Sequence, residues 1–415
     1  MKVYTNYKIF SGNWIDEIPA HWNDVNLKRA TQLLYGNSLS KDNRVKGNVP
    51  VYGSNGVVGY HNNSITKAPC IIIGRKGSFG KVTYSESKCF PIDTTYYIDQ
   101  TATKNNLRWV FYLLEALELD AYSKDSAVPG LSREDAYIRK IPHPPLHEQQ
   151  TIANFLDRQT TQIDALIAKK QRLIELLQEY RTALINQAVT KGINPNVPMK
   201  DSGFEWLGEI PENWSIVPLK FLGEITLGKM LTPTNKGGYI EKPYLRAKNI
   251  GWESVNHIDD IKTMWFSPYE LLKYRLSKDD LLISEGGEVG RTAIWNNELD
   301  ECYIQNSVHK VTLYNKQNPH YFLYQSQLFG KKGYYDSIVS RVSISHLTYE
   351  KLKEIKFIVP PTEEQYAIAN FLKHNLKIID HLMQLTNKEI YHFQEYKKSL
   401  TFFTVTGKID VRDQR

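Results

Sequence analysis

The sequence has little cysteine. Its three cysteines, Cys70, Cys89 and Cys302, are scattered, odd in number and never spaced as Cys-x-x-Cys. That pattern indicates a reducing compartment and argues against a structural zinc site. No apolar run approaches the roughly 18 residues that a membrane-spanning helix needs, and residues 1–8 lack the apolar core of a signal peptide. We therefore expect a cytoplasmic protein with no metal bound to this chain.

The usual signatures of catalysis are missing too. An amino-methyltransferase needs a short Asn/Asp-Pro-Pro-aromatic loop, but the Pro-Pro pairs here lie in His-Pro-Pro-Leu at 143–146 and Val-Pro-Pro-Thr at 359–362. The glycine-rich stretch 74–82 is one residue too long for a phosphate-binding loop and has Val82 where Ser or Thr would stand. The histidines show no His-Glu-x-x-His spacing. The sequence therefore predicts a chain without catalysis of its own.

The overall composition is that of an ordinary globular protein. Hydrophobic residues make up 41% of the 415 positions and charged residues 23%, and the formal net charge is +7. This length predicts two domains or slightly more. A mild basic excess is compatible with nucleic-acid binding but does not require it. The 26 tyrosines, many of them beside Lys, Arg, Asn or Ser, are more suggestive of such binding, and the alternative explanation is packing in β-strands, which favour this residue.

Two blocks of the sequence occur twice. The Trp-rich block 14–22 (WIDEIPAHW) returns at 206–214 (WLGEIPENW), and the Pro-Pro block 144–156 (PPLHEQQTIANFL) returns at 360–372 (PPTEEQYAIANFL). The chain therefore holds two copies of one plan, in which a variable globular stretch lies between the two blocks. Two similar halves with different middles suggest one molecule that reads two different things at a fixed separation.

The repeats divide the chain into four regions: a first globular domain at 1–146, a central helical region at 147–192, a second globular domain at 200–362 and a C-terminal helical region at 363–406. Short β-branched runs broken by glycines predict strands at 68–74, 81–84, 94–98, 280–284 and 308–313, and helices are expected at 107–119 and 321–329. We therefore predict an α+β fold with an internal pseudo-twofold repeat, in which two strand-rich domains are separated by two long antiparallel helices that form a coiled coil.

Both long helices carry apolar residues at alternating spacings of three and four, the pattern of a coiled-coil seam. Paired prolines and acidic residues indicate where each begins, and Gly192 and Gly407 where each ends. At about 1.5 Å per residue such a helix is roughly 66 Å long, so the pair is a plausible spacer for half-sites about 34–36 Å apart on DNA. The alternative is that each helix packs separately on its own domain. The expected seam residues, also candidates for docking a partner, are Ile152, Leu156, Ile163, Leu166, Leu173, Leu177, Ile368, Leu372, Ile379, Leu382 and Phe393.

Two glycine-rich stretches, 74–82 and 284–291, correspond to each other. Each places Gly, a polar or charged residue, an apolar residue, Gly and a basic residue after a probable strand. A tight structural hairpin is one explanation. The other is a hairpin whose tip contacts DNA, because Arg and Lys pair with guanine edges and Glu with the cytosine amino group. The candidate contact residues are Arg75, Lys76, Ser78 and Lys81 in the first copy and Glu285, Glu288 and Arg291 in the second.

Three further stretches are characteristic: YGSNGVVGY at 52–60, YLRAKNI at 244–250 and LLIS at 281–284. Together with the repeated blocks, they make nearly the whole chain resemble the specificity subunit of type I restriction–modification systems. We add to the candidate DNA-binding residues two from the first stretch, two from the second, and three from a polar stretch before the C-terminal helix: Ser54, Asn55, Lys248, Asn249, Arg341, Ser343 and Ser345.

The resemblance implies two target-recognition domains, each reading one half of a bipartite double-stranded DNA target. It also implies helical regions that dock two modification subunits, which methylate adenine, and a complex completed by two restriction subunits. The cofactors would then belong to those partners: S-adenosylmethionine to the modification subunits, ATP and Mg²⁺ to the restriction subunits, and none to this chain. No membrane partner is expected.

Two other classes of function stay open. One is the recognition part of a methyltransferase–endonuclease whose catalysis is undetected, which a methyl-transfer assay of the chain alone would reveal. The other is a coiled-coil scaffold with two protein-binding heads. A steep loss of affinity with salt would separate DNA binding from that scaffold.

Overall fold

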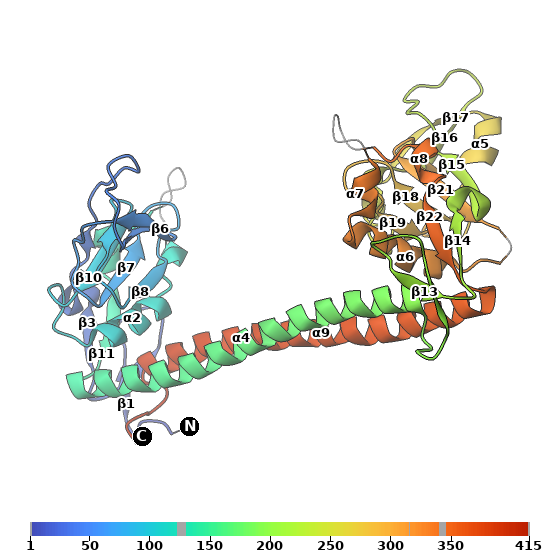
Figure 1. The fold of residues 1–415 in the computed structure, drawn as a ribbon. Helices are drawn as coiled ribbons and strands as arrows, with labels where there is room; N and C mark the ends of the chain where they lie inside the picture. Colours follow the sequence, from blue (N-terminus) through green and yellow to red (C-terminus); the bar gives the residue numbers. More distant parts are fainter. Residues whose placement is uncertain (1, 123–129, 315, 340–345, 414–415) are drawn as a thin grey trace. The chain divides into compact units, whose positions relative to one another are not determined.

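The chain folds into two compact units, Met1–Arg172 with Thr386–Arg415, and Leu173–Leu385 (Figure 1). The computed structural model describes residues 2–122, 130–314, 316–339 and 346–413. Each unit contains one strand-rich domain and a stretch of both long helices. The predicted fold class, two α+β domains with an internal repeat and two long helices, is confirmed.

The first unit is built on a four-stranded antiparallel sheet in the order β4-β10-β7-β8, beside a smaller sheet in the order β6-β5-β9. All five residues of β7 are buried, which explains its continuous apolar run, and α2 packs on β7 and β8. The elements are α1 (Leu27–Ala30), β4 (Leu34–Tyr35), β5 (Val49–Gly53), β6 (Gly56–His61), β7 (Cys70–Gly74), β8 (Val82–Ser85), β9 (Phe90–Pro91), β10 (Thr95–Asp99), α2 (Leu107–Ala116), the 3₁₀ helix η1 (Leu119–Tyr122) and α3 (Arg133–Tyr137).

The second unit repeats this design with the sheet β15-β21-β18-β19, beside the sheet β17-β16-β20. Here α6 packs on β19. The elements are η2 (Leu219–Phe221), β15 (Gly223–Leu227), β16 (Ile240–Leu245), η3 (Ala247–Asn249), η4 (Ile258–Asp260), β17 (Lys262–Phe266), α5 (Pro268–Tyr274), β18 (Leu281–Ser284), β19 (Thr292–Ile294), β20 (Tyr303–Ile304), β21 (Val308–Leu313), α6 (Pro319–Lys331), α7 (Tyr334–Ile338) and α8 (Tyr349–Leu352). The five predicted strands are confirmed as β7, β8, β10, β18 and β21; the predicted helix 321–329 lies within α6, while the helix at 107–119 ends at Ala116.

Each domain begins and ends in a pair of neighbouring antiparallel strands. In the first unit β3 (Asn23–Asn26) pairs with β11 (Lys140–His143), and in the second β14 (Ser215–Pro218) pairs with β22 (Lys356–Val359). Each Trp-rich block contributes one strand to a shorter pair just before these: β2 (Glu17–Pro19) pairs with β1 (Tyr7–Ile9), and β13 (Glu209–Pro211) with β12 (Met199–Asp201). The chain therefore leaves each domain beside the point where it entered.

The long helices are α4 (Leu146–Lys191) and α9 (Thr362–Val405). Each begins directly after the Pro-Pro pair, and each is followed by a glycine in the left-handed region, Gly192 with φ of +77° and Gly407 with φ of +74°. Glycine adopts this conformation without a steric penalty and so ends a helix. The predicted helix starts and stops are confirmed to within a residue.

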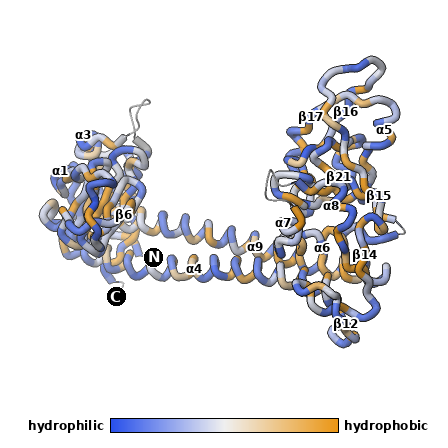
Figure 2. The backbone as a smooth tube through the Cα atoms, turned by 45° about the horizontal axis from the view of Figure 1, so that its top comes forward, coloured by the Kyte–Doolittle hydropathy of each residue, from blue (hydrophilic) through white to orange (hydrophobic). Residues whose placement is uncertain are grey.

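Within each unit the two long helices pair with each other in antiparallel fashion. In the first unit Lys397 Nζ lies 2.7 Å from Asp164 Oδ2, and Lys170 Nζ lies 2.6 Å from Glu389 Oε2. In the second unit Arg181 contacts Asp380 in the same manner. Residue numbers fall along α9 as they rise along α4, so the predicted antiparallel arrangement is confirmed. Figure 2 shows hydrophobic and hydrophilic residues alternating along both helices, as the pairing requires.

Part of the predicted seam is wrong. Leu166, Leu173 and Leu382 are 42%, 40% and 44% exposed, so they do not lie between the helices. The other predicted residues are buried or partly buried in the two cores, which also contain the partly buried Ile167 in the first unit and Leu184 and Met383 in the second. Charged residues explain the error. Lys170 is only partly exposed and Arg181 contacts the opposite helix, so a prediction that followed apolar residues alone moved onto the outer face.

The Trp-rich block packs onto the first turn of a long helix. Trp22 Nε1 and the Tyr4 hydroxyl each donate a hydrogen bond of 3.0 Å to Glu148 Oε2, and His21 Nε2 lies 2.6 Å from Glu148 Oε1. In the second unit the equivalent tryptophan, Trp214, donates to Glu364 Oε2 at 3.0 Å. Burial raises the pKa of the Tyr4 hydroxyl, and the charge of the same carboxylate raises it further. The repeated glutamates therefore accept specific hydrogen bonds besides facing the helix dipole.

The glutamine that follows each glutamate fastens the helix to the domain. Gln149 accepts a hydrogen bond of 3.0 Å from the backbone of Asn106 and donates one of 2.9 Å to Pro144 O. Gln365 makes the equivalent bonds: it accepts one of 3.1 Å from Asn318 N and donates one of 2.9 Å to Pro360 O. Both asparagines are the N-caps of the domain helices α2 and α6. The repeated Glu-Gln pair thus joins three elements in each unit.

Candidate nucleic-acid interface

The two glycine-rich stretches form the same turn in both units. In the first, between β7 and β8, Gly74 N donates to Lys81 O at 2.8 Å and Gly80 N donates to Gly74 O at 2.9 Å; the equivalent bonds between β18 and β19 measure 2.8 and 3.1 Å. Gly80 has φ of +78° and lies so close to Asp120 that a Cβ atom would come within 2.3 Å of its backbone nitrogen. The backbone of the turn is therefore fixed, and the two copies differ in their tip side chains.

In the first unit several candidate residues gather at this turn. Lys81 Nζ donates to Asn55 O at 3.0 Å and to Asn55 Oδ1 at 2.8 Å, which joins the turn to the loop between β5 and β6. Ser54 lies against the other side of the turn, where a Cβ atom on Gly77 would be 3.4 Å from Ser54 Oγ. The structure thus brings Ser54, Asn55 and Lys81 together, although they come from different parts of the sequence.

Arg75 is held by its own domain. Its Nε and Nη2 atoms donate to Asp93 O at 3.1 and 2.8 Å, and its guanidinium lies 5.5 Å from the centre of the Tyr35 ring. Lys76 and Ser78, by contrast, are exposed at the tip of the turn. These two side chains are better placed than Arg75 to reach a ligand, while contact with DNA stays a prediction for all three.

In the second unit Arg291 occupies the position of Lys81 and makes the corresponding contact. Its Nη2 atom donates a hydrogen bond of 2.9 Å to Ala247 O. The backbone nitrogen of Ala247 donates one of 3.0 Å to Ser307 Oγ, outside the turn. A basic side chain at the end of each turn therefore ties it to a backbone carbonyl of a neighbouring loop. That role explains why both copies carry a cation there.

Two glutamates lie in the second turn, Glu285 at the position of Arg75 and Glu288 at the position of Ser78. Glu288 is exposed, and its Oε1 atom accepts a hydrogen bond of 2.9 Å from Trp252 Nε1. Glu285 is half-buried, and its burial raises the pKa of the carboxyl group, while the nearby His346 acts in the opposite direction. The second tip thus offers a carboxylate, which only accepts hydrogen bonds, where the first offers a serine hydroxyl and a neighbouring lysine, which can donate them. Such a difference suits recognition of different base edges.

Lys248 lies in a charged cluster. Its Nζ atom is 2.8 Å from Asp260 Oδ2, and Lys262 and Arg246 lie 3.2 Å from the same carboxylate. The hydrogen bonds from Lys248 and Lys262 hold the pKa of Asp260 well below its usual range. Three cations around one carboxylate leave this exposed corner of the domain with a positive excess, which is compatible with phosphate binding.

The prediction for Asn249 is wrong. Its side chain is fully buried, and its Oδ1 atom accepts a hydrogen bond of 3.0 Å from Arg246 N. Its amide nitrogen donates to His257 O at 3.2 Å and to Asn256 O at 3.4 Å. The asparagine therefore caps η3 and closes the loop after it, which uses its polar groups internally and leaves none for DNA.

Comparison with known proteins decides the family. The model of the type I restriction modification DNA specificity domain matches residues 19–176 and 211–392, one match for each copy of the repeat. The chain belongs to this family.

Relatives support the assignment over the full length. The chain is 27% identical to the putative type I restriction enzyme MjaX specificity subunit of Methanocaldococcus jannaschii, with 97% of each protein covered. It is 26% identical to the MjaVIII specificity subunit of the same organism, over 74% of this chain and 71% of that protein. A chain from a structural study of complex assembly in the type I restriction–modification system shares the fold, with a TM-score of 0.66 and 16% identity over 94% of this chain and 99% of that one.

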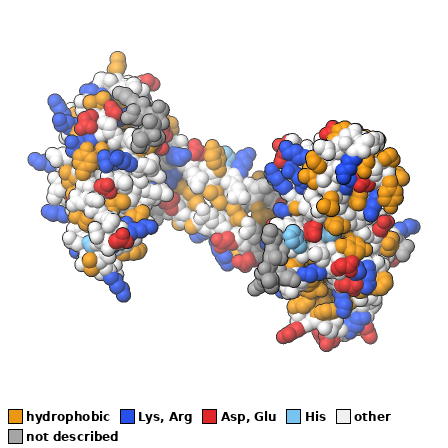
Figure 3. Space-filling model, turned by 90° about the horizontal axis from the view of Figure 1, so that it is seen from above, with side chains coloured by type: hydrophobic (Ala, Val, Ile, Leu, Met, Phe, Trp, Pro, Cys, Tyr) orange, Lys and Arg blue, Asp and Glu red, His pale blue; other side chains and the backbone are white. Residues whose placement is uncertain are grey.

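The remaining candidates and classes of site can be placed briefly. Arg341, Ser343 and Ser345 lie outside the described residues. Within the ranges that the structure describes, no three His, Cys, Asp or Glu side chains are grouped as a metal site would need, and no helix is long and apolar enough to cross a bilayer. On the face seen in Figure 3, Lys and Arg side chains lie among hydrophobic and uncharged ones on each unit. Trp252 is not among the predicted residues, because nothing in its local sequence pattern indicates its contact with Glu288.

Proposed function

We propose that this specificity-family chain reads a bipartite DNA sequence, one half-site per strand-rich domain. The observation that carries the proposal is the pair of turns with the same backbone and different tips, in which Lys76 and Ser78 of the first correspond to Gly286 and Glu288 of the second. A shared backbone presents side chains in an equivalent way, and donors and acceptors recognise different base edges.

We further propose that the long helices dock partner subunits. Exposed hydrophobic side chains are common on both, although the helices' facing sides already pack together, and large exposed apolar surfaces usually mark interaction sites. Those on α4 include Leu166, Leu173, Leu176 and Tyr180, and those on α9 include Ile378, Leu382, Leu385, Tyr391 and Tyr396. On this proposal, Leu166, Leu173 and Leu382 act in docking instead of in the seam.

The partners would be two modification subunits, with two restriction subunits completing the complex. S-adenosylmethionine would then be bound by the modification subunits, and ATP and Mg²⁺ by the restriction subunits, leaving this chain without catalysis or cofactor. The proposal rests on family membership and on the absence of catalytic signatures from the sequence.

Adenine methylation in a host that carries this chain with its modification partner tests the proposal. Sequencing the methylated sites should give one bipartite motif. Replacing residues 214–358 with the equivalent domain of a related protein should then change one half of the motif and leave the other. A single continuous motif, or a change in both halves, would contradict the assignment of one half-site to each domain.

A further inference from the structure

A single arginine joins both long helices to the second recognition domain. Arg181, on α4, forms an ion pair with Glu253 of that domain, and its Nε atom lies 3.4 Å from Asp380 Oδ1 of α9. Its side chain is 23% exposed, and a guanidinium offers several donors in a fixed plane. The position of Glu253 therefore depends on the helix pair as well as on its own domain.

The backbone of Glu253 is held in an uncommon conformation. Its φ of +84° lies in a region that residues other than glycine seldom adopt, and such conformations persist where the surrounding contacts impose them. One contact is the hydrogen bond of 2.9 Å from Glu253 N to Thr292 O, at the start of β19. The side chain of Glu253 is held by the ion pair with Arg181. The residue is thus fixed from the recognition sheet on one side and from the helices on the other.

The neighbouring residue carries this fixation to the tip of the turn. Trp252 Nε1 donates to Glu288 Oε1 at 2.9 Å. Its ring packs against α6 at Gly330, where a Cβ atom would come within 2.3 Å of the ring, so the indole has little room to shift. With one carboxylate oxygen bonded to Trp252, the other is left oriented to accept a further hydrogen bond.

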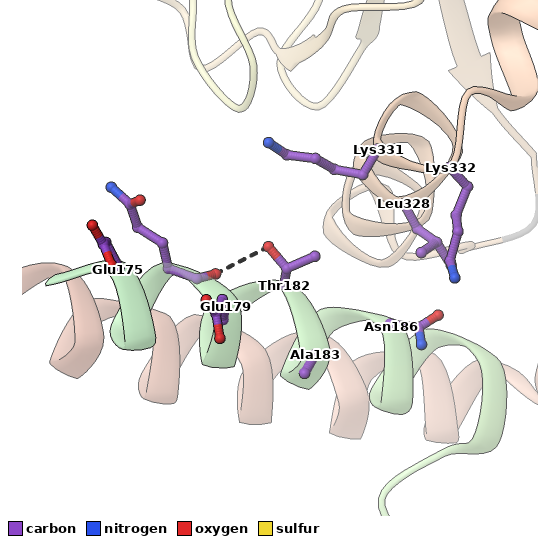
Figure 4. A pocket seen from close by; sticks show the side chains of 9 residues that line it. Glu175, Glu179, Thr182, Ala183, Asn186, Leu328, Lys331 and Lys332 are labelled. Atoms are coloured by element: carbon purple, nitrogen blue, oxygen red, sulfur yellow. Dashed lines mark hydrogen bonds between the residues drawn. The ribbon is translucent and has the colours of Figure 1, made fainter. Parts of the chain in front are cut away.

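Two hollows lie beside the contacts that connect Arg181 to Glu288. A groove of about 690 Å³ separates α4 from the end of α6, with Thr182 and Asn186 on one side and Lys331 and Lys332 on the other (Figure 4). Beside it, a cavity of about 520 Å³ is lined by Arg181, Trp252, Glu253 and Glu288, among others. Both hollows lie at the edge of the hydrophobic core in which Ile185 of α4 and Leu328 of α6 pack together. The ion pair between Arg181 and Glu253 lies in the lining of the second cavity.

We propose that Arg181 and Trp252 are positioning residues for the second half-site, acting through Glu288. The helices hold Glu253, the adjacent Trp252 orients the Glu288 carboxylate, and the free oxygen accepts a hydrogen bond from the exocyclic amino group of a base, as cytosine offers in the major groove. The inference rests on the proposed function and adds to it a route by which the helices set base recognition without touching DNA.

Binding of the assembled protein to its target and to every single-base-pair replacement of that target tests the inference. Trp252→Phe keeps the ring and removes only the N–H donor, and Arg181→Ala removes the tie to the helices. Each should lower discrimination at one base pair of the second half-site by about tenfold, the range expected of one base contact, and leave the first half-site unchanged. In a Glu288→Ala background, Trp252→Phe should add nothing, because the two act through one contact.

Lys170→Ala is the matched control, since Lys170 pairs with Glu389 on the opposite helix in the first unit. It should leave second-half discrimination intact. If Trp252→Phe and Arg181→Ala weaken binding to all duplexes evenly, or only lower the melting temperature, their role is merely structural and the inference is overturned. If the unaltered protein recognises no bipartite sequence, the proposed function itself fails, which is a distinguishable result.

Discussion

Replacing Glu148 with alanine should destabilise the first unit strongly. Its carboxylate accepts hydrogen bonds from Trp22 and Tyr4 and lies within hydrogen-bonding distance of His21. Trp22 is 0% exposed and Tyr4 is 3% exposed, so water does not reach their polar groups easily. The substitution leaves these buried donors without the acceptor that the native chain provides.

The size of the effect follows from these contacts. A buried donor left unpaired costs about 1–3 kcal/mol. The partners share one carboxylate, so their contributions are coupled and do not simply add. We expect Glu148→Ala to lower the free energy of unfolding of the first unit by about 3–5 kcal/mol.

Native-state hydrogen exchange measures this unit by unit, which matters because a chain with two units need not unfold in one step. Glu364→Ala is the control, since its carboxylate accepts from Trp214 at the equivalent place in the second unit. It should cost about 1–3 kcal/mol there and leave the first unit unchanged. A loss below about 1 kcal/mol for Glu148→Ala, or one equal to that of Glu364→Ala, would refute the reasoning from the number of donors.

Three further outcomes are expected. Leu166→Asp should change the free energy of unfolding by no more than about 0.5 kcal/mol and impair binding of partner subunits in a pull-down. Ile163→Asp, at a buried position, should lower the free energy of unfolding by several kcal/mol. Equal losses of stability would contradict the placement of Leu166 on the outer face of the helices. Lys76→Ala should lower discrimination at one base pair of the first half-site by about tenfold, and an equal loss on all sequences with a salt slope reduced by about one would instead indicate a phosphate contact. Burial lowers the pKa of His309, so below about pH 6.5 the unfolded chain takes up a proton that the folded chain does not, and the second unit should lose stability. Between pH 7 and 5, the free energy of unfolding should therefore depend less on pH for His309→Gln than for the native chain. An unaltered pH dependence would rule this out.

The architecture could be predicted from the sequence because its signals are local. Paired prolines start the long helices, and Gly192 and Gly407 end them, since those backbone conformations depend on the residue itself. Buried central strands appear as continuous apolar runs. The repeated blocks then supplied the domain order without any knowledge of long-range contacts.

The seam and the candidate site were harder to predict because they depend on distant partners. Arg181 and Lys170 are charged, yet the structure uses both for contacts with the opposite helix, so apolar spacing alone selected the wrong face at Leu166. Asn249 has the chemistry of a DNA-binding residue, but the backbone groups around it bury its side chain and take up its hydrogen bonds. The role of Trp252 could not be predicted, because it depends on the fold, which places its indole N–H beside Glu288.

The strand pairs that begin and end each domain have a consequence for how these proteins diversify. Because β3 lies beside β11, and β14 beside β22, each domain is inserted into the helical framework through two adjacent strands. Residues 27–139 and 219–355 can therefore differ in length and content without moving the points at which they are attached. Such an insertion behaves as an interchangeable cassette. Recombination that joins a foreign cassette at these strands would give a new reader in one step, while the framework stays the same.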